Sequence, residues 1–253
     1  MPRITINNKS FNNVELVLFD KDGTLIDIHH YWVSMIKLRA KILVDRYFSG
    51  ANNKMEFELI NLMGVDIINN KMKPNGPIGV RPREFIVNIV TCLLTKNKID
   101  TDNSKIEGLF KEVDKATESD FSSLIKLLPN VELLLQDLRG CNIKMAIVST
   151  DITHRAILAM KAVGLEGFFD VIVGGDAVEK TKPSPDLALY VMSKLNISAD
   201  NVLVIGDHLV DMKMAQAANI LTNVGVLTGI SNKEDFLCEN IEIIDNLNFI
   251  NVK

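Results

Sequence analysis

The most informative segment of this 253-residue chain is residues 14–25, which read Val-Glu-Leu-Val-Leu-Phe-Asp-Lys-Asp-Gly-Thr-Leu. Apart from Glu15, its first half is an apolar run typical of a strand that is buried on both faces of a parallel sheet. The run ends at two carboxylates, Asp20 and Asp22, and a glycine follows them directly. The segment therefore predicts a strand that delivers acidic side chains to the carboxyl edge of a sheet, where α/β proteins bind their ligands.

Further apolar segments along the chain predict strands of the same sheet. They are residues 145–148, 171–173, 202–205, 222–227 and 241–244. Helical periodicity lies between them, for example at residues 131–138 and 187–195. This alternation of strands and helices predicts an α/β fold with a doubly wound, parallel, Rossmann-like sheet.

A helical insertion interrupts this alternation directly after the first strand. Strand signals are nearly absent there, and helices are expected at residues 31–48, 55–63, 82–94 and 106–116. The predicted organisation is an α/β core domain of residues 1–27 and 124–253, with an all-helical domain of residues 28–123 inserted into it. Because the insertion leaves from the carboxyl end of a strand, we expect it to act as a lid over the site, although it could also simply stabilise the core.

The composition argues against several classes of protein. Hydrophobic residues make up 47% and charged residues 24%, as in ordinary globular proteins, and the net charge of −4 offers no basic surface for nucleic acid or an anionic membrane. No apolar stretch approaches the roughly 18 residues of a spanning helix, and none follows Arg3 and Lys9 to form a secretory signal. The cysteines, Cys92, Cys141 and Cys238, lack disulfide or zinc spacing. We expect a cytoplasmic protein that acts on a small molecule, and no pattern assigns an oligomeric state.

The pair Asp20 and Asp22 brings two like charges close together, which requires a cation or a shared proton nearby. A magnesium site, an acid/base pair, or both would meet this requirement. An EF-hand loop is rejected, because it would place Leu18 and His29 at ligand positions. A P-type ion pump would need membrane spans. A plain surface turn remains open, but it explains poorly why carboxylates follow a wholly apolar strand.

A second acidic strand end occurs at Gly206-Asp207, and Asp211 follows four residues later. Together with Asp20, Asp207 offers the oxygen ligands that a hard divalent cation prefers. Asp211 could instead be an acidic residue in the first turn of a helix, where the helix dipole favours it.

Two further elements suit an anion. Ser149 and Thr150 end a third strand, and they could bind phosphate, cap the helix that begins near Ile152, or do both. Lys182 precedes Pro183 and could direct its ammonium toward an anion at the strand ends, although a solvated lysine is the simpler interpretation.

The order of these four elements resembles the signature of the haloacid dehalogenase superfamily. That signature is Asp-x-Asp-Gly-Thr, then a strand ending in Ser or Thr, then Lys-Pro, then Gly-Asp-x-x-x-Asp. The helical insertion looks like the C1-type cap of the phosphoglycolate phosphatase-like branch. The resemblance covers the whole chain in motif order.

The resemblance implies a role for each acidic residue. Asp20 would be the nucleophile and Asp22 the general acid/base. Magnesium would be held by the Asp20 carboxylate, the Asp22 backbone carbonyl and Asp207, with Asp211 in support.

The resemblance also implies that Ser149 and Lys182 hold the phosphoryl oxygens. Thr150 stands where this branch usually has asparagine, so one phosphate or substrate contact is expected to differ. His208 follows Asp207 where a small polar residue is more usual, and it could orient a metal ligand or be a packed or solvated histidine.

Within the superfamily, an acid at position 22 favours phosphate-ester hydrolysis, because it can protonate a leaving alkoxide and then deprotonate water. We therefore expect a magnesium-dependent phosphatase for a small phosphorylated metabolite of the phosphoglycolate or sugar-phosphate type. A phosphotransferase or phosphoglucomutase-like enzyme is one alternative, and a non-enzymatic receiver-like phospho-acceptor is another, against which the large insertion argues. Arg81 and Arg83, on either side of Pro82, are candidates for contacting the leaving group, with ordinary solvated charge as the alternative.

Overall fold

The computed structural model describes residues 3–74, 76–78, 81–237 and 241–253, so Cys238 lies outside the described residues. The chain divides into two compact units, which we call the core unit (residues 1–27 and 125–253) and the helical unit (residues 28–124). This division lies one residue from the boundary expected from the sequence. Among the described helices, none combines the length and apolar character that crossing a bilayer requires.

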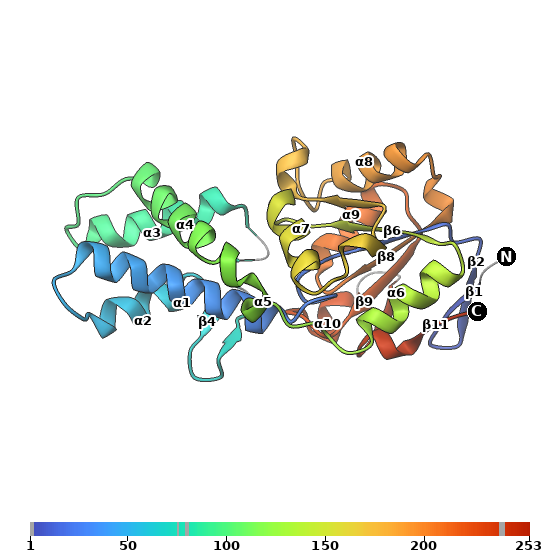
Figure 1. The fold of residues 1–253 in the computed structure, drawn as a ribbon, viewed down its shortest axis with the longest axis horizontal. Helices are drawn as coiled ribbons and strands as arrows, with labels where there is room; N and C mark the ends of the chain where they lie inside the picture. The colour runs from blue at the N-terminus through green and yellow to red at the C-terminus, as the bar shows by residue number, and fades with distance from the viewer. Residues whose placement is uncertain (1–2, 75, 79–80, 238–240) are drawn as a thin grey trace. The chain divides into compact units, whose positions relative to one another are not determined.

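The core unit is built on a six-stranded parallel sheet (Figure 1). Its strands, in order across the sheet, are β10 (Glu242–Ile244), β9 (Thr222–Val226), β8 (Val202–Gly206), β3 (Leu16–Phe19), β6 (Lys144–Val148) and β7 (Val171–Val173). From β3 the chain passes first to β6 and β7 on one side and then to β8, β9 and β10 on the other. This doubly wound order confirms the predicted fold class and places the switch point at β3.

Helices cover both faces of this sheet: α6 (Val131–Gly140), α7 (Thr153–Ala162), α8 (Asp186–Leu195), α9 (Leu209–Ala217) and α10 (Lys233–Phe236). Figure 1 shows α8 and α9 on one face and α6 on the other. Leu16 and Leu18 belong to one hydrophobic cluster with Leu187 of α8 and Met212 of α9. Since successive strand side chains point to opposite faces, the residues between them serve the other face. All four residues of β3 are therefore buried and apolar.

A small antiparallel sheet joins the two ends of the chain and was not predicted. Its order is β11 (Ile250–Val252), β1 (Arg3–Ile6) and β2 (Lys9–Asn12). These strands are short and β2 is mostly polar, so the sequence signal is weak. Asn7 and Asn8 adopt positive φ angles of 47° and 68° between β1 and β2. Two neighbouring residues with positive φ angles are typical of a two-residue hairpin turn. The Asn-Asn pair was the one sequence signal for this hairpin.

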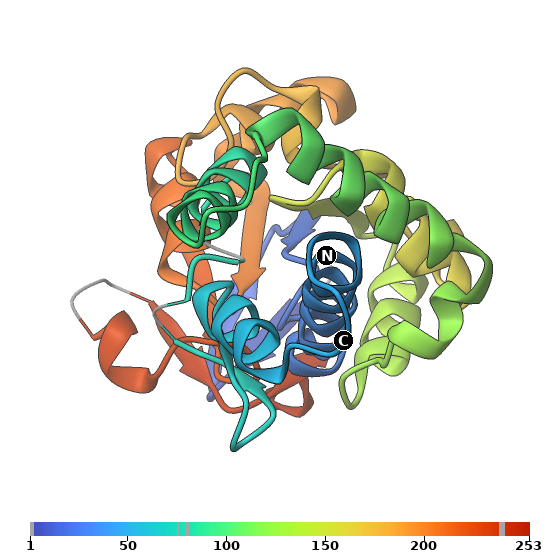
Figure 2. The ribbon, with the colours of Figure 1, turned by 90° about the vertical axis from the view of Figure 1, so that its left-hand side faces the viewer.

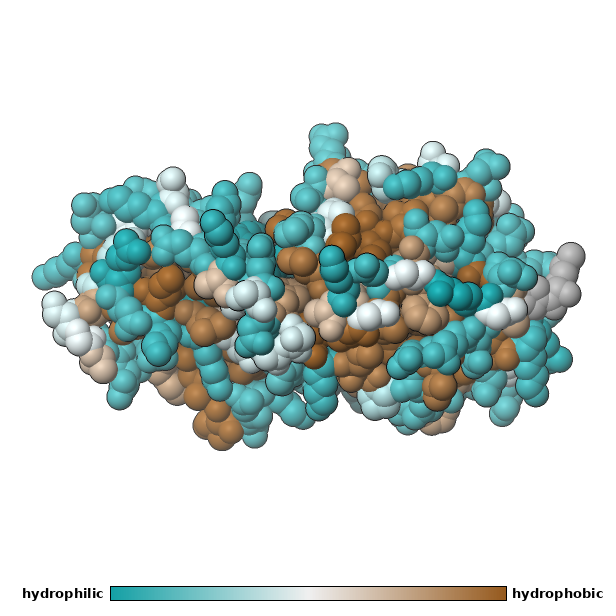
Figure 3. Space-filling model, viewed as in Figure 1, coloured by the Kyte–Doolittle hydropathy of each residue, from teal (hydrophilic) through white to brown (hydrophobic). Residues whose placement is uncertain are grey.

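The helical unit contains α1 (Ile28–Tyr47), α2 (Asn53–Leu62), α3 (Arg83–Lys96), α4 (Asn103–Ala116) and α5 (Phe121–Leu124). Within this unit α1 packs against α2 and α4, as Figure 2 allows the reader to follow. Asn52 and Asp102 start α2 and α4, because each side chain accepts a backbone N–H of the first turn. A hairpin of two short strands, β4 (Val65–Asp66) and β5 (Lys71–Met72), adds to the expected helices. Between these strands, Ile68 is 92% exposed. Figure 3 shows that the surface of the protein mixes hydrophilic and hydrophobic side chains, with hydrophobic colour where the hairpin projects.

Candidate active site

The acidic residues of the sequence motifs meet at the carboxyl edge of the sheet. β3 and β8 are neighbouring parallel strands in which Phe19 pairs with Ile205. The backbone N–H of Asp20 donates to the carbonyl oxygen of Ile205 at 2.9 Å, which continues this register by one residue. Asp20 and Asp207 therefore leave the sheet side by side.

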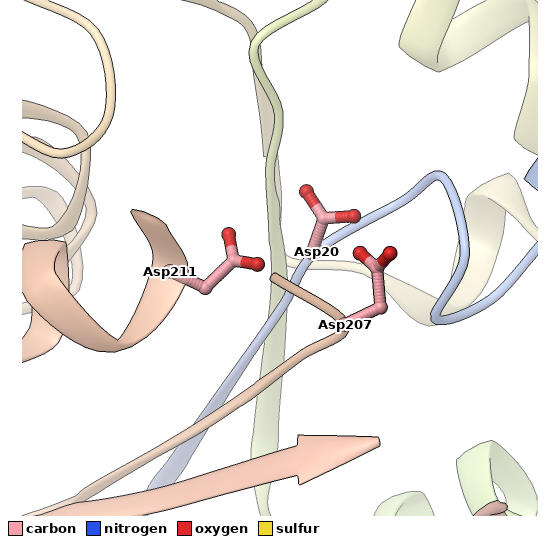
Figure 4. Close-up of side chains that lie close together, drawn as sticks. All are labelled: Asp20, Asp207 and Asp211. Carbon is pink, nitrogen blue, oxygen red and sulfur yellow. The ribbon is translucent and has the colours of Figure 1, made fainter. Parts of the chain in front are cut away.

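Asp20, Asp207 and Asp211 form the acidic cluster shown in Figure 4. One carboxylate oxygen of each lies within 4.8 Å of the others, and the three residues are only 9%, 3% and 2% exposed. Asp20 follows β3, Asp207 follows β8 and Asp211 lies in the first turn of α9, and their carboxylates project into the same region. Burying like charges so closely is unfavourable without a cation, and carboxylate oxygens are the ligands that Mg²⁺ prefers.

Two glycines leave the space that the Asp207 carboxylate occupies. Its Oδ2 accepts the backbone N–H of Ile230 at 3.0 Å. A Cβ added at Gly23 would lie 2.5 Å from that oxygen, and one added at Gly229 would lie 1.7 Å from it. Gly23 also has a φ of +92°, which residues with side chains rarely adopt. The loop after β9, whose Thr228 hydroxyl donates to the Gly23 carbonyl at 2.6 Å, is a part of the site that sequence reasoning missed.

Lys182 is buried against this cluster. Its Nζ lies 2.6 Å from Oδ1 of Asp20 and 2.6 Å from Oδ1 of Asp211, and the residue is 5% exposed. Burial alone lowers the pKa of the Lys182 ammonium, but attraction to the two carboxylates outweighs this effect, so the pKa is raised above its ordinary value. At neutral pH Lys182 therefore supplies a fixed positive charge beside Asp20.

Asp22 has a different partner, the neighbouring Lys21. The Nζ of Lys21 lies 2.8 Å from Oδ1 of Asp22 and 3.4 Å from Oδ2 of Asp151, and Lys21 is completely buried. Sequence reasoning assigned no role to Lys21 or Asp151, because a lysine is usually solvated. The only signal was that Lys21 stands directly between two carboxylates.

The electrostatics of the site favour a bound cation. Burial is the largest effect on Asp20, Asp22 and Asp207, and it raises the pKa of each, with Asp207 raised well above its usual range. Among the described residues that these contacts link, five carboxylates, with Asp151 and Asp211 included, stand against two lysine ammonium groups, an excess of three negative charges when all are ionised. A divalent cation would offset two of these charges, so the donor set fits magnesium.

Ser149 and Thr150 follow β6 at the same edge of the sheet. Ser149 is 1% exposed and its Oγ accepts the backbone N–H of Asp151 at 3.1 Å, whereas Thr150 is exposed. Neither residue caps α7. The backbone N–H and the hydroxyl of Thr153 both donate to Oδ1 of Asp176 at 2.7 Å, so the cap comes from the segment after β7. The capping interpretation of Ser149 and Thr150 is therefore wrong.

His208 caps α9 and holds Asp211. The ring Nδ1 accepts the backbone N–H of Val210 at 3.2 Å, and the backbone N–H of His208 donates to Oδ2 of Asp211 at 3.1 Å. Nδ1 therefore carries no proton. Burial lowers the pKa of His208, which favours this neutral form. The histidine thus orients the turn that carries Asp211.

The two candidate arginines of the helical unit differ in their surroundings. Arg83 is ion-paired through Nε with Glu107 at 2.9 Å and through Nη1 with Asp114 at 2.5 Å. Arg81 is exposed, and its guanidinium lies 5.7 Å from the ring centroid of Phe85. Among the described residues Arg81 has no ion-pair partner, so of the two it is the one whose charge is available to a ligand.

A fold with acidic strand ends, a buried lysine and a helical insertion defines a class of enzymes, and comparison with known proteins identifies it. Residues 17–224 match the family of haloacid dehalogenase-like hydrolases, a span that includes all four motifs. The chain belongs to this family, and it is therefore an enzyme of the hydrolase class.

Known relatives extend along most of the chain. It is 25% identical to a phosphorylated carbohydrates phosphatase of Thermotoga maritima, covering 88% of this chain and 90% of the relative. It is 28% identical to a phosphoglycolate phosphatase of Rhodobacter capsulatus, covering 81% and 80%. The crystal structure of a β-phosphoglucomutase from Clostridium difficile superimposes with a TM-score of 0.62 at 22% identity, covering 93% of this chain and 92% of that one. This last protein shares the fold.

Proposed function

We propose that this hydrolase is a magnesium-dependent phosphatase that acts on a small phosphorylated metabolite through an aspartyl-phosphate on Asp20. One observation carries the proposal: the Asp20 carboxylate lies beside the Lys182 ammonium and in one cluster with the oxygens of Asp207 and Asp211. A nucleophile placed beside both a cation and a set of metal-ligating oxygens suits attack on a phosphoryl group. The names of the two phosphatase relatives support a phosphoglycolate or phosphorylated-carbohydrate substrate.

In the first half-reaction, a carboxylate oxygen of Asp20 attacks phosphorus in line and the bond to the ester oxygen breaks. Asp22 gives its proton to that leaving oxygen. Lys182 and Ser149 hold the phosphoryl oxygens and offset the charge that develops on them, with Thr150 at the edge of the same site.

Magnesium would be held by the carboxylates of Asp20 and Asp207 and the backbone carbonyl of Asp22, with Asp211 in support. When bound, it would supply positive charge to the phosphoryl oxygens. The excess of buried carboxylates is what supports this assignment.

In the second half-reaction, Asp22 accepts a proton from water as the water attacks the aspartyl-phosphate. Phosphate then leaves and the Asp20 carboxylate is restored. We assign the inserted residues 28–123 as the cap that excludes bulk water and selects the leaving group, with Arg81 as the contact favoured over Arg83. The insertion point supports this, because the helical unit begins at Ile28, eight residues after Asp20.

A phosphotransferase or mutase acting on a sugar phosphate is the second candidate, since a β-phosphoglucomutase shares the fold. It would use the same residues but return the phosphoryl group to a sugar hydroxyl. Membership of a hydrolase family removes the receiver-like alternative. We place the enzyme in the cytoplasm, because the described cysteines, Cys92 and Cys141, are free thiols.

The proposal is tested by incubating the purified protein and Mg²⁺ with phosphoglycolate, several sugar phosphates and p-nitrophenyl phosphate. Release of inorganic phosphate over many turnovers is expected, and it should be lost in Asp20→Asn and in a chelator. Isomerised sugar phosphate without free phosphate would favour the mutase. No turnover on any of these substrates would contradict the proposal.

A further inference from the structure

We propose that Lys21 is a positioning residue, whose ammonium holds the Asp22 carboxylate in the orientation needed for proton transfer while Asp151 anchors the lysine from its other side. The inference rests on the proposed phosphatase function, in which Asp22 is the acid/base group.

The first observation is the burial of the lysine between two carboxylates. Lys21 is 0% exposed, and a lysine is stable in such a position only when its charge is paired. Its Nζ lies 2.8 Å from Oδ1 of Asp22 and 3.4 Å from Oδ2 of Asp151. Asp22 follows β3 and Asp151 follows the neighbouring parallel strand β6, so one ammonium links the ends of two strands.

The second observation concerns the oxygens of Asp151. Its Oδ1 accepts the backbone N–H of Ile152 at 2.8 Å, which fixes the carboxylate. Its Oδ2 is buried and has no hydrogen-bond partner among the described residues. Burying a carboxylate oxygen without such a partner costs free energy. The nearby charge of the Lys21 ammonium offsets this cost at Asp151.

The contact determines which oxygen of Asp22 faces the substrate. Oδ1 is engaged by Lys21, which leaves Oδ2 to carry the proton. When the ester leaves, the O–H bond of Asp22 breaks, an O–H bond forms on the leaving oxygen, and the new carboxylate charge stands beside the ammonium. When water attacks, the carboxylate takes one proton from it and the starting arrangement returns. A fixed orientation removes part of the entropy cost of both transfers.

The two buried lysines therefore serve different steps. Lys182 contacts Asp20 and Asp211, the nucleophile and its neighbour, whereas Lys21 contacts Asp22 and Asp151. Loss of Lys182 should affect phosphoryl transfer to Asp20 whatever the leaving group. Loss of Lys21 should affect most those leaving groups that need a proton.

The test compares kcat/KM on two aryl phosphates that differ in leaving group. Phenolate resembles the ionised tyrosine side chain, whose conjugate acid has a pKa of about 10, whereas nitrophenolate is a much weaker base. In Lys21→Met, which keeps the stem and removes the charge, we expect phenyl phosphate to lose at least about tenfold more than p-nitrophenyl phosphate. Lys21→Arg should restore part of that ratio. Lys126→Met removes an exposed lysine paired with Asp27 and should leave the ratio unchanged.

Equal losses on both substrates in Lys21→Met, or no loss on either, would overturn the inference. If Lys21→Met does not fold, Asp151→Asn provides the second variant, because it weakens the anchor while keeping the shape. An unchanged ratio in folded Asp151→Asn would overturn the anchoring role. These failures differ from failure of the proposed function, in which the wild-type protein itself would turn over neither substrate.

Discussion

The ammonium of Lys182 and the carboxylate of Asp20 lie 2.6 Å apart, although 162 residues separate them in the sequence. The parallel sheet produces this meeting, because Asp20 leaves the carboxyl end of its central strand and Lys182 lies on the connection from β7 to β8. The same edge of the sheet receives Ser149 and Asp207. Motifs far apart in sequence thus become one site.

Removing the Lys182 charge should damage both activity and stability. Lys182→Met leaves Asp20 and Asp211 buried without their cation, and breaking such a pair costs about 3–5 kcal/mol. We also expect kcat on p-nitrophenyl phosphate to fall by about 10²–10³, the usual loss of a group that stabilises transition-state charge. Urea unfolding and steady-state kinetics measure the two effects. Lys180→Met, at an exposed position, is the control, and equal behaviour of the two variants would contradict this role.

Magnesium affinity should still change with pH at values above the ordinary pKa range of carboxyl groups. Protons and metal compete for the same oxygens, and burial raises the pKa of Asp207 well above its usual value. The affinity measured by calorimetry should therefore increase from about pH 5 to about pH 7. An affinity that stays constant over this range would contradict the argument.

The same raised pKa affects the metal-free protein in the opposite direction. Because the folded-state pKa of Asp207 exceeds its unfolded value, the protonated form favours folding. That stabilisation is present below the unfolded pKa and is lost as pH rises through the folded one. In chelator, the melting temperature should therefore fall with rising pH, and added magnesium should reverse the fall. If magnesium gave no greater protection at high pH than at low pH, the coupling would be absent.

The helical unit should depend on one partly buried carboxylate. Asp114 accepts from Arg39 at 3.0 Å and from Arg83 at 2.5 Å, and Arg39 is 4% exposed. Asp114→Asn leaves a buried guanidinium without its counter-charge, which should lower the free energy of unfolding by about 3–5 kcal/mol. Glu112→Gln is the control, since its pair with Arg46 is exposed and should contribute less than about 1 kcal/mol. Matching urea curves for both variants would refute the prediction.

Metal binding should be sensitive to a single methyl group beside Asp207. In Gly229→Ala the added Cβ would lie 1.7 Å from Oδ2 of Asp207, so the carboxylate or the loop must move. Magnesium affinity should fall by at least about tenfold, as when groups that orient a ligand are changed. Gly167→Ala adds a Cβ with nothing within 4 Å and should bind as the wild type does. Unaltered magnesium affinity in Gly229→Ala would show that metal binding does not require the Asp207 carboxylate at its observed place.

The sequence predicted the parts of the molecule that repeat strong patterns. All four residues of the strand that ends before Asp20 are apolar and buried, so the apolar run in the sequence matches the burial in the fold. β1 and β2 escaped prediction because polar residues interrupt them, so neither strand forms an apolar run. The role of Lys21 escaped it too, since no local pattern tells a buried lysine from a solvated one. Its environment depends on Asp151, which the fold of β6 beside β3 brings near.

The central claim is that Asp20 carries the phosphoryl group and Asp22 the proton. Rapid-quench kinetics of Asp22→Asn with p-nitrophenyl phosphate, followed by mass spectrometry of the digested enzyme, tests it most directly. Nitrophenolate leaves without a proton, so a burst of about one equivalent per site should precede slow turnover, because hydrolysis lacks its base. The phosphoryl group should be found on the peptide at Asp20, and Asp20→Asn should show neither burst nor label. A phosphoryl group on any other residue, or a burst in Asp20→Asn, would contradict the account.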